Sequence, residues 1–131
     1  MFFTHVGLIC NRPEIQPLLP QVIFVGAAAI SDTDWAAATA SLPSNVYVKR
    51  MPKGWNNTEQ HQIILRMLGM ILQPFATRFQ ATLSFDAAPL HLAPAVLMEL
   101  KAAGIWWIVI PARLTWMLQP LDAHSCMLYK N

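Results

Sequence analysis

The sequence predicts an α/β fold in one domain, and three observations lead to that class. Short apolar runs rich in β-branched residues and bounded by proline are typical of strands. A longer segment carries apolar residues at the spacing of one helix face. Near the end of the chain, a strand, a helix and a second strand follow one another with short loops, which predicts two parallel strands. The length of 131 residues suits a single domain with a sizeable core.

The first half of the chain predicts two strands and a shorter third one. Residues 2–10 and 21–27 are apolar runs with proline beside them, as expected for strands. Residues 46–48 are expected to add a short strand. The intervening residues 28–45 are rich in alanine, serine, aspartate and threonine, and we interpret them as a loop or insertion with room for one helical turn around Trp35.

A long helix is predicted to follow. Asn56 and Glu59 have the spacing of a capping box, with asparagine in place of the usual serine or threonine. Pro74 is expected to end the helix or to kink its last turn. The apolar residues between them recur on one helix face, and they are Ile64, Met67, Leu68, Ile71 and Phe75.

The second half of the chain has sharper boundaries. Residues 81–85 are expected to form a strand that ends at Asp86. Pro94 then stands in the first turn of a helix, and Gly104 closes that helix. Residues 105–110 are an unbroken β-branched and aromatic run, which predicts a strand buried on both faces.

Composition and charge narrow the classes of function. Hydrophobic residues make up 55% of the chain and charged residues 12%, so there is ample apolar surface for folding, and disorder is excluded. This balance also indicates a surface that is covered by something outside the chain. The net charge of +2 is too small to attract nucleic acid by itself. Lys49, Arg50 and Lys53 form a basic cluster that is a candidate for contact with a DNA backbone, and the alternative is an ordinary solvated loop.

Targeting signals are not evident in the sequence. The apolar residues 1–10 lack the basic start and the cleavage site of a signal peptide. The longest apolar runs fall short of the roughly 20 residues that a membrane span needs. Cys10 and Cys126 have no metal-ligand spacing, and we interpret both as buried free thiols. The chain is therefore expected to be soluble and intracellular.

Two aspartates have positions that suit a divalent cation. Asp86 ends an apolar strand, where open α/β sheets place their ligands, and Asp122 stands at the start of a final helix predicted from about Pro120 to Asn131. Mg²⁺ takes oxygen ligands and commonly only one or two carboxylates. From spacing alone, the favoured interpretation of Asp86 is a turn residue at a strand end. Asp122 is likewise consistent with a first-turn residue that favours the helix dipole.

Two segments around these aspartates resemble a known family. Residues 83–91, LSFDAAPLH, resemble a hydrophobic strand that ends in Asp-Asn-Ala-Pro-x-His. Residues 109–122, VIPARLTWMLQPLD, resemble the partner segment, a strand followed by Pro-Pro-Asn-x-Thr and Gln-Pro-Leu-Asp. These segments hold the second and third acidic positions of the pogo- and jerky-like DDE transposases, a group of endonucleases related to centromere protein B. Softer matches lie at residues 4–10, 19–26 and 54–55.

The resemblance implies an RNase H-like fold and metal-dependent chemistry on DNA. Antiparallel strands would come first in a mixed sheet with helices on both faces, and the family's first strand would be missing before residue 4. That strand carries the first metal-binding aspartate, so Asp86 and Asp122 alone would hold Mg²⁺ or Mn²⁺ weakly. His91 would contact the phosphate or orient Asp86, although it could equally be a helix-start histidine without chemistry. Ala87 replaces the family's asparagine, which bears on the surroundings of the metal. His61 is interpreted as structural.

Three functions follow from these expectations. The first is a nucleic-acid-binding, transposase-derived endonuclease domain that is inactive alone, nuclear by its family, and associated with DNA and with a second copy or a missing N-terminal segment. The second is a domesticated or decayed fragment that acts as a non-catalytic module for binding DNA or protein. The third is an intact small nuclease with an unrecognised third carboxylate.

Overall fold

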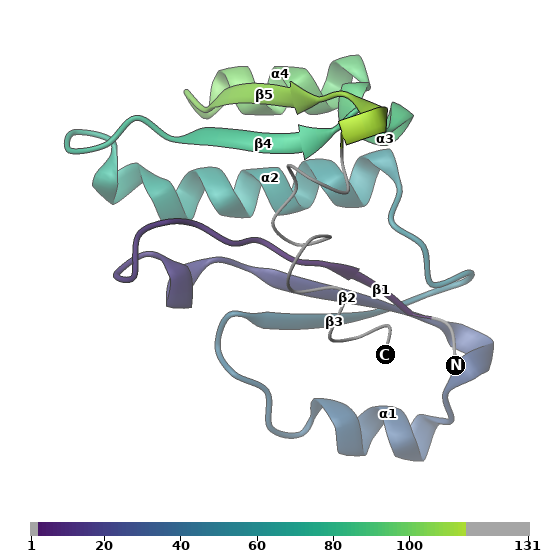
Figure 1. The fold of residues 1–131 in the computed structure, drawn as a ribbon. Helices are drawn as coiled ribbons and strands as arrows, with labels where there is room; N and C mark the ends of the chain where they lie inside the picture. Colours follow the sequence, from purple (N-terminus) through teal and green to yellow (C-terminus); the bar gives the residue numbers. More distant parts are fainter. Residues whose placement is uncertain (1–2, 115–131) are drawn as a thin grey trace. The chain divides into compact units, whose positions relative to one another are not determined.

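The computed structural model describes residues 3–114, and the chain divides into two compact units, residues 1–57 and 58–131. Each unit contains helices and a small sheet of its own (Figure 1). The α/β class predicted from the sequence is therefore confirmed. The described residues form two sheets where one mixed sheet was expected. The finer RNase H-like assignment stays a prediction.

The first unit contains a three-stranded sheet in the order β1-β2-β3. Its strands are β1 (Phe3–Val6), β2 (Gln21–Gly26) and β3 (Val46–Met51). The central strand β2 is antiparallel to β1, as expected, and parallel to β3, which was not expected. Parallel neighbours need a crossover connection, and the helix α1 (Asp32–Thr39) supplies it. The segment was interpreted as a loop with room for one helical turn around Trp35, and it contains an eight-residue helix that includes Trp35.

The start of α1 explains why this helix forms in a small, polar segment. Ser31 is its N-cap, and the Ser31 hydroxyl accepts a hydrogen bond from the backbone N–H of Asp34 at 3.1 Å. Asp32 and Asp34 place negative charge in the first turn, where it opposes the positive end of the helix dipole. No residue of α1 is buried, so local capping rather than an apolar stripe marks this helix in the sequence.

Side-chain amides shorten the first strand relative to its prediction. β1 ends at Val6 rather than at residue 10, because glutamine side chains bind the backbone beyond it. The backbone N–H of Leu8 donates to Oε1 of Gln21 at 3.2 Å, and its carbonyl accepts from Nε2 of Gln21 at 2.7 Å. Nε2 of Gln16 donates to the same carbonyl at 3.0 Å. These side-chain bonds take the place of the backbone hydrogen bonds that a neighbouring strand would make with Leu8.

The second unit contains the predicted strand–helix–strand. Its elements are α2 (Thr58–Leu72), β4 (Thr82–Asp86), α3 (Pro89–Leu92), α4 (Pro94–Ala102) and β5 (Trp106–Ile110). β4 and β5 are parallel, which confirms the prediction. Pro94 is the first residue of α4, and Gly104 follows that helix with a φ of +68°. Gly104 therefore supplies the left-handed residue that ends a helix.

Helices α2 and α4 pack against each other and contribute much of the buried apolar surface of this unit. α2 ends at Leu72, and Pro74 lies in the 3₁₀ turn that follows it, as predicted. α2 begins at Thr58, two residues after the predicted cap Asn56. A Cβ at Gly69 would lie 3.0 Å from Cβ of Ala103, so the absence of a side chain lets α2 and α4 approach closely. The buried residues of the two helices are His61, Ile64, Leu65, Leu68, Val96 and Leu100.

The strand β5 is not buried on both faces as the sequence predicts. Trp106 is 66% exposed and Ile108 is 56% exposed, whereas Ile110 is buried. Trp106 is paired with Thr82, which is also exposed, so this face of the two-stranded sheet is open. An unbroken apolar run cannot reveal how many strands or helices surround it, and that is why the prediction failed. None of the described helices is long and apolar enough to cross a membrane.

Candidate functional site

Asp86 lies at the carboxyl end of β4, as predicted, with its side chain one-third exposed. Its Oδ1 accepts a hydrogen bond from the backbone N–H of Ala88 at 3.2 Å. This bond folds the chain into a turn directly after the strand, the local structure that aspartate favours at such positions. The turn fixes the direction of the carboxylate and leaves part of it accessible to solvent.

His91 contacts Asp86 directly. Pro89 starts the four-residue helix α3, which turns the chain back toward the end of β4. Nδ1 of His91 lies 2.7 Å from Oδ1 of Asp86 and 3.3 Å from its backbone oxygen. A carboxylate accepts hydrogen bonds, so with Asp86 ionised the Nδ1 of His91 carries the proton. The structure therefore brings together two of the residues that the sequence singled out.

A third residue at this place is His61, which was interpreted only as structural. Its ring centroid lies 5.0 Å from that of His91, with the ring planes inclined by 35°. The ring of Phe85 meets His91 edge-on at 5.5 Å. Burial, and to a smaller extent the charge of His91, lowers the pKa of His61 from 6.5 to about 4. His61 lies one turn before Ile64 on the buried face of α2. This position on the helix was the one feature of the sequence that could have predicted its burial.

The second predicted metal ligand cannot be placed. Asp122, the final helix and Cys126 lie outside the described residues. Within residues 3–114, no three histidine, cysteine, aspartate or glutamate side chains are grouped in a way that could hold a metal ion. Cys10, which was expected to be buried, is an exposed free thiol. Of the two predicted metal ligands, only Asp86 lies within the described residues.

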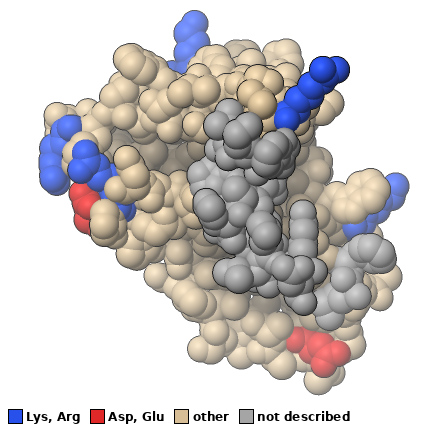
Figure 2. All heavy atoms as spheres, viewed as in Figure 1, with Lys and Arg blue, Asp and Glu red and all other residues tan. Residues whose placement is uncertain are grey.

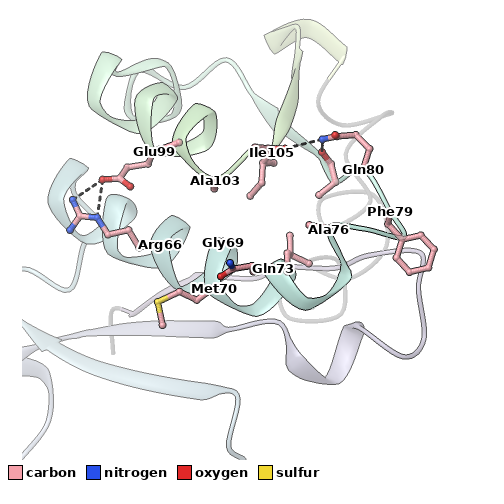
Figure 3. Close-up of a pocket in the computed structure, with 14 residues that line it drawn as sticks. Arg66, Gly69, Met70, Gln73, Ala76, Phe79, Gln80, Glu99, Ala103 and Ile105 are labelled. Atoms are coloured by element: carbon pink, nitrogen blue, oxygen red, sulfur yellow. Dashed lines mark hydrogen bonds and ion pairs between the residues drawn. The ribbon is translucent and has the colours of Figure 1, made fainter.

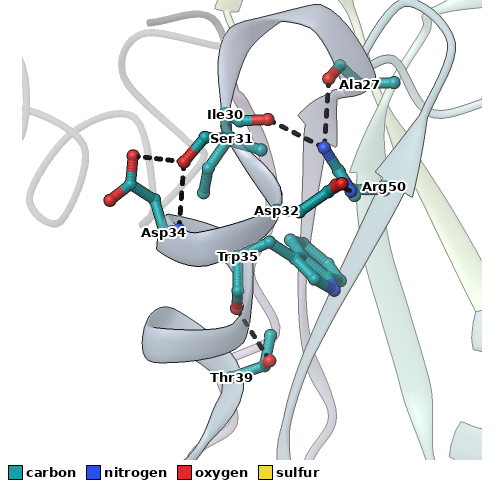
Figure 4. A network of polar contacts seen from close by, with 8 residues as sticks. All are labelled: Ala27, Ile30, Ser31, Asp32, Asp34, Trp35, Thr39 and Arg50. Carbon is teal, nitrogen blue, oxygen red and sulfur yellow. Dashed lines mark hydrogen bonds and ion pairs between the residues drawn. The ribbon is translucent and has the colours of Figure 1, made fainter.

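The three residues of the basic cluster have different environments. Arg50 joins β3 to the start of α1 (Figure 4). It forms an ion pair with Asp32 at 2.6 Å, and it donates to the backbone oxygens of Ile30 at 2.8 Å and Ala27 at 3.3 Å. Its guanidinium also lies 5.6 Å from the ring centroid of Trp35. These contacts give Arg50 a structural role, so its guanidinium is poorly placed to bind DNA.

Lys53 has the more accessible position in this cluster. It is exposed in the loop after β3, and Lys49 is half-buried on the strand itself. The neighbouring Trp55 is 66% exposed. Uncharged residues cover most of the described surface seen in Figure 2. Contact of these lysines with DNA stays a prediction.

The second unit also has a pocket of about 550 Å³, away from Asp86 and His91. It lies beside the second half of α2 and the end of α4, and Met70 and Phe79 are among its lining residues (Figure 3). Arg66 and Glu99, the charged residues of its lining, form an ion pair with each other at 2.6 Å. Because these charges are paired, the pocket shows no charge directed at a ligand.

Comparisons with protein-family models, with curated proteins and with solved structures find no match to this chain.

Proposed function

We propose that this chain is a nucleic-acid-binding domain derived from a DDE transposase, and that it does not cleave DNA by itself. The proposal rests on the resemblance of residues 83–91 and 109–122 to the family segments. The observation that carries it is the hydrogen bond of 2.7 Å between His91 and Asp86. In the family motif, the aspartate that corresponds to Asp86 is a metal ligand, and His91 contacts Asp86 directly.

The surroundings of Asp86 fit one weakly held divalent cation. Its Oδ1 is engaged by His91 and by the backbone of Ala88, and its side chain is one-third exposed. A hard cation such as Mg²⁺ readily binds through one or two carboxylates and keeps several waters. Asp86 would hold the ion together with Asp122. The ion would supply Lewis-acid activation of a phosphate oxygen or of water.

The lack of cleavage follows from the number of carboxylates. In-line displacement at phosphate commonly uses two ions about 3.5–4 Å apart, and two carboxylates do not readily hold both ions. Of the other acidic residues, Asp32 pairs with Arg50, and Asp34 binds the hydroxyl of Ser31 at 2.8 Å. Both carboxylates are therefore already engaged in local bonds at the start of α1, which disfavours them as metal ligands.

A nicking assay tests this proposal. The purified chain is incubated with supercoiled plasmid in Mg²⁺ or Mn²⁺, and binding is followed separately by anisotropy of a labelled duplex. We expect binding without nicking. Nicking that Asp86→Ala abolishes would show that a third ligand exists and would make the chain an intact nuclease. The absence of both DNA binding and metal binding would contradict the proposal.

A non-catalytic protein-interaction module is a second candidate, favoured by the exposed face of β5. Trp106 and Ile108 present apolar side chains there, and large exposed apolar surfaces commonly bind other proteins. If this face mediates association, Trp106→Lys should convert an associating sample to a monomer in analytical ultracentrifugation without lowering stability. A wild-type chain that is already monomeric at high concentration would argue against self-association through β5.

A further inference from the structure

Two histidines that are distant in the sequence meet beside Asp86. His61 belongs to α2, and His91 belongs to the short helix α3. Their ring centroids are 5.0 Å apart, within the range of about 4.5–7 Å at which aromatic rings attract one another. His61 is 8% exposed and lies on the buried face of its helix. Such a buried ring has little freedom to move.

We propose that His61 is a positioning residue, whose buried ring holds His91 in the rotamer that turns Nδ1 toward Asp86. The orientation of His91 is independent of the proposed function, and only its consequence for metal binding rests on that function.

The short helix α3 explains why His91 needs such support. α3 has four residues and contains no buried side chain. A half-exposed histidine on a short helix has several rotamers, and packing against fixed neighbours selects one of them. The neighbours of the His91 ring are the rings of His61 and Phe85 and the carboxylate of Asp86. His61 and Phe85 are both buried, so they provide fixed surfaces.

The uncharged state of His61 is compatible with this role. Burial lowers its pKa to about 4, so at neutral pH it presents a neutral ring to His91. A charged His61 would repel a protonated His91 and would also be costly to bury. Substitution by another neutral planar ring should therefore preserve the orientation of His91.

The test reads the protonated nitrogen of His91 in the full chain by long-range ¹H–¹⁵N spectra at neutral pH. In the wild type, we expect the signature of a proton on Nδ1, and Asp86→Ala provides the reference for its loss. His61→Ala should shift His91 to the Nε2–H tautomer that a free histidine side chain favours in water. His61→Phe keeps a planar ring and should retain the Nδ1 signature.

A matched control separates positioning from general destabilisation. Ile64→Ala removes buried volume one turn along the same face of α2, and it should leave the His91 signature unchanged. Retention of the signature in folded His61→Ala would overturn the inference, as would its loss in folded His61→Phe or Ile64→Ala. If His61→Ala does not fold, His61→Leu takes its place, because it removes the planar ring and keeps apolar volume; loss of the signature in folded His61→Leu supports the inference, and its retention overturns it. An intact signature in a chain that binds neither DNA nor metal would contradict the proposed function and leave this inference standing.

Discussion

A Cβ atom at Gly54 would lie 2.6 Å from the backbone nitrogen of Gly26. Gly54 has a φ of +67°, so its backbone conformation also favours glycine. This close approach ties the loop after β3 to the end of β2. It thereby fixes the positions of Lys53 and Trp55, which flank Gly54 in the chain.

Two glycine substitutions should separate crowding from backbone strain. Gly54→Ala should destabilise the chain by more than about 3 kcal/mol, because the new Cβ collides with backbone in addition to the strained φ. Gly104 has a similar φ of +68°, but a Cβ there would meet open space. We therefore expect Gly104→Ala to lower the free energy of unfolding by about 1 kcal/mol. Urea unfolding measures both values. Equal losses would show that the contact with Gly26 is absent in solution.

Arg50 should act on stability rather than on DNA binding. Arg50→Met removes bonds to the backbone oxygens of Ile30 and Ala27, and we expect a loss of about 2 kcal/mol in the free energy of unfolding. Asp32→Asn removes the ion pair, whose carboxylate is 93% exposed, and one negative charge from the first turn of α1, so together these losses should cost about 1 kcal/mol. Thermal or urea unfolding of the two variants distinguishes these effects. A larger loss for Asp32→Asn would contradict this assignment.

The buried His61 should make stability depend on pH. Its pKa is lowered from 6.5 to about 4 in the folded chain, so between these values the unfolded chain binds more protons. The free energy of unfolding is therefore highest above about pH 6.5 and falls as the pH is lowered toward 4. The loss is up to about 3 kcal/mol, since one pKa unit corresponds to about 1.4 kcal/mol. His61→Phe should lose less stability over that range. Parallel pH profiles for the two proteins would indicate that His61 titrates normally.

The parts of the fold that the sequence predicted are those that depend on short-range signals. Pro94 and Gly104 mark the ends of α4 locally, and the five-residue spacing of Asp86 and His91 brings them together through one turn. The contact of His61 with His91 joins separate helices, so only its position on the apolar face of α2 pointed to burial.

The parts that the sequence missed depend on what surrounds a segment. Arg50 belonged to a basic cluster in the sequence, but its partners are Ala27 and Ile30 in the connection after β2 and Asp32 at the start of α1. The exposure of β5 depends on the number of neighbouring strands, which its apolar run does not encode.

Lys49 on β3 and Lys53 in the loop after it should determine DNA affinity if this part of the chain binds the DNA backbone. Each phosphate contact that is lost should reduce the salt dependence of binding by about 0.9 in the slope of log K against log salt. We therefore expect Lys49→Gln with Lys53→Gln to lower the slope by about 2. Lys101→Gln, an exposed lysine on α4, is the control and should leave the slope unchanged. Anisotropy of a labelled duplex at several salt concentrations measures the slopes, and equal slopes would exclude this part of the chain as the DNA contact.

Paramagnetic broadening by Mn²⁺ would show directly whether Asp86 is a metal ligand. In ¹H–¹⁵N spectra of the full chain, substoichiometric Mn²⁺ should broaden the amide signals of Ala88 and His91, which lie next to the carboxylate. Asp86→Asn keeps the size of the side chain and removes its charge, so the broadening at these amides should disappear. Broadening that persists in Asp86→Asn, or its absence from these amides in the wild type at millimolar Mn²⁺, would contradict the assignment of Asp86 as a metal ligand.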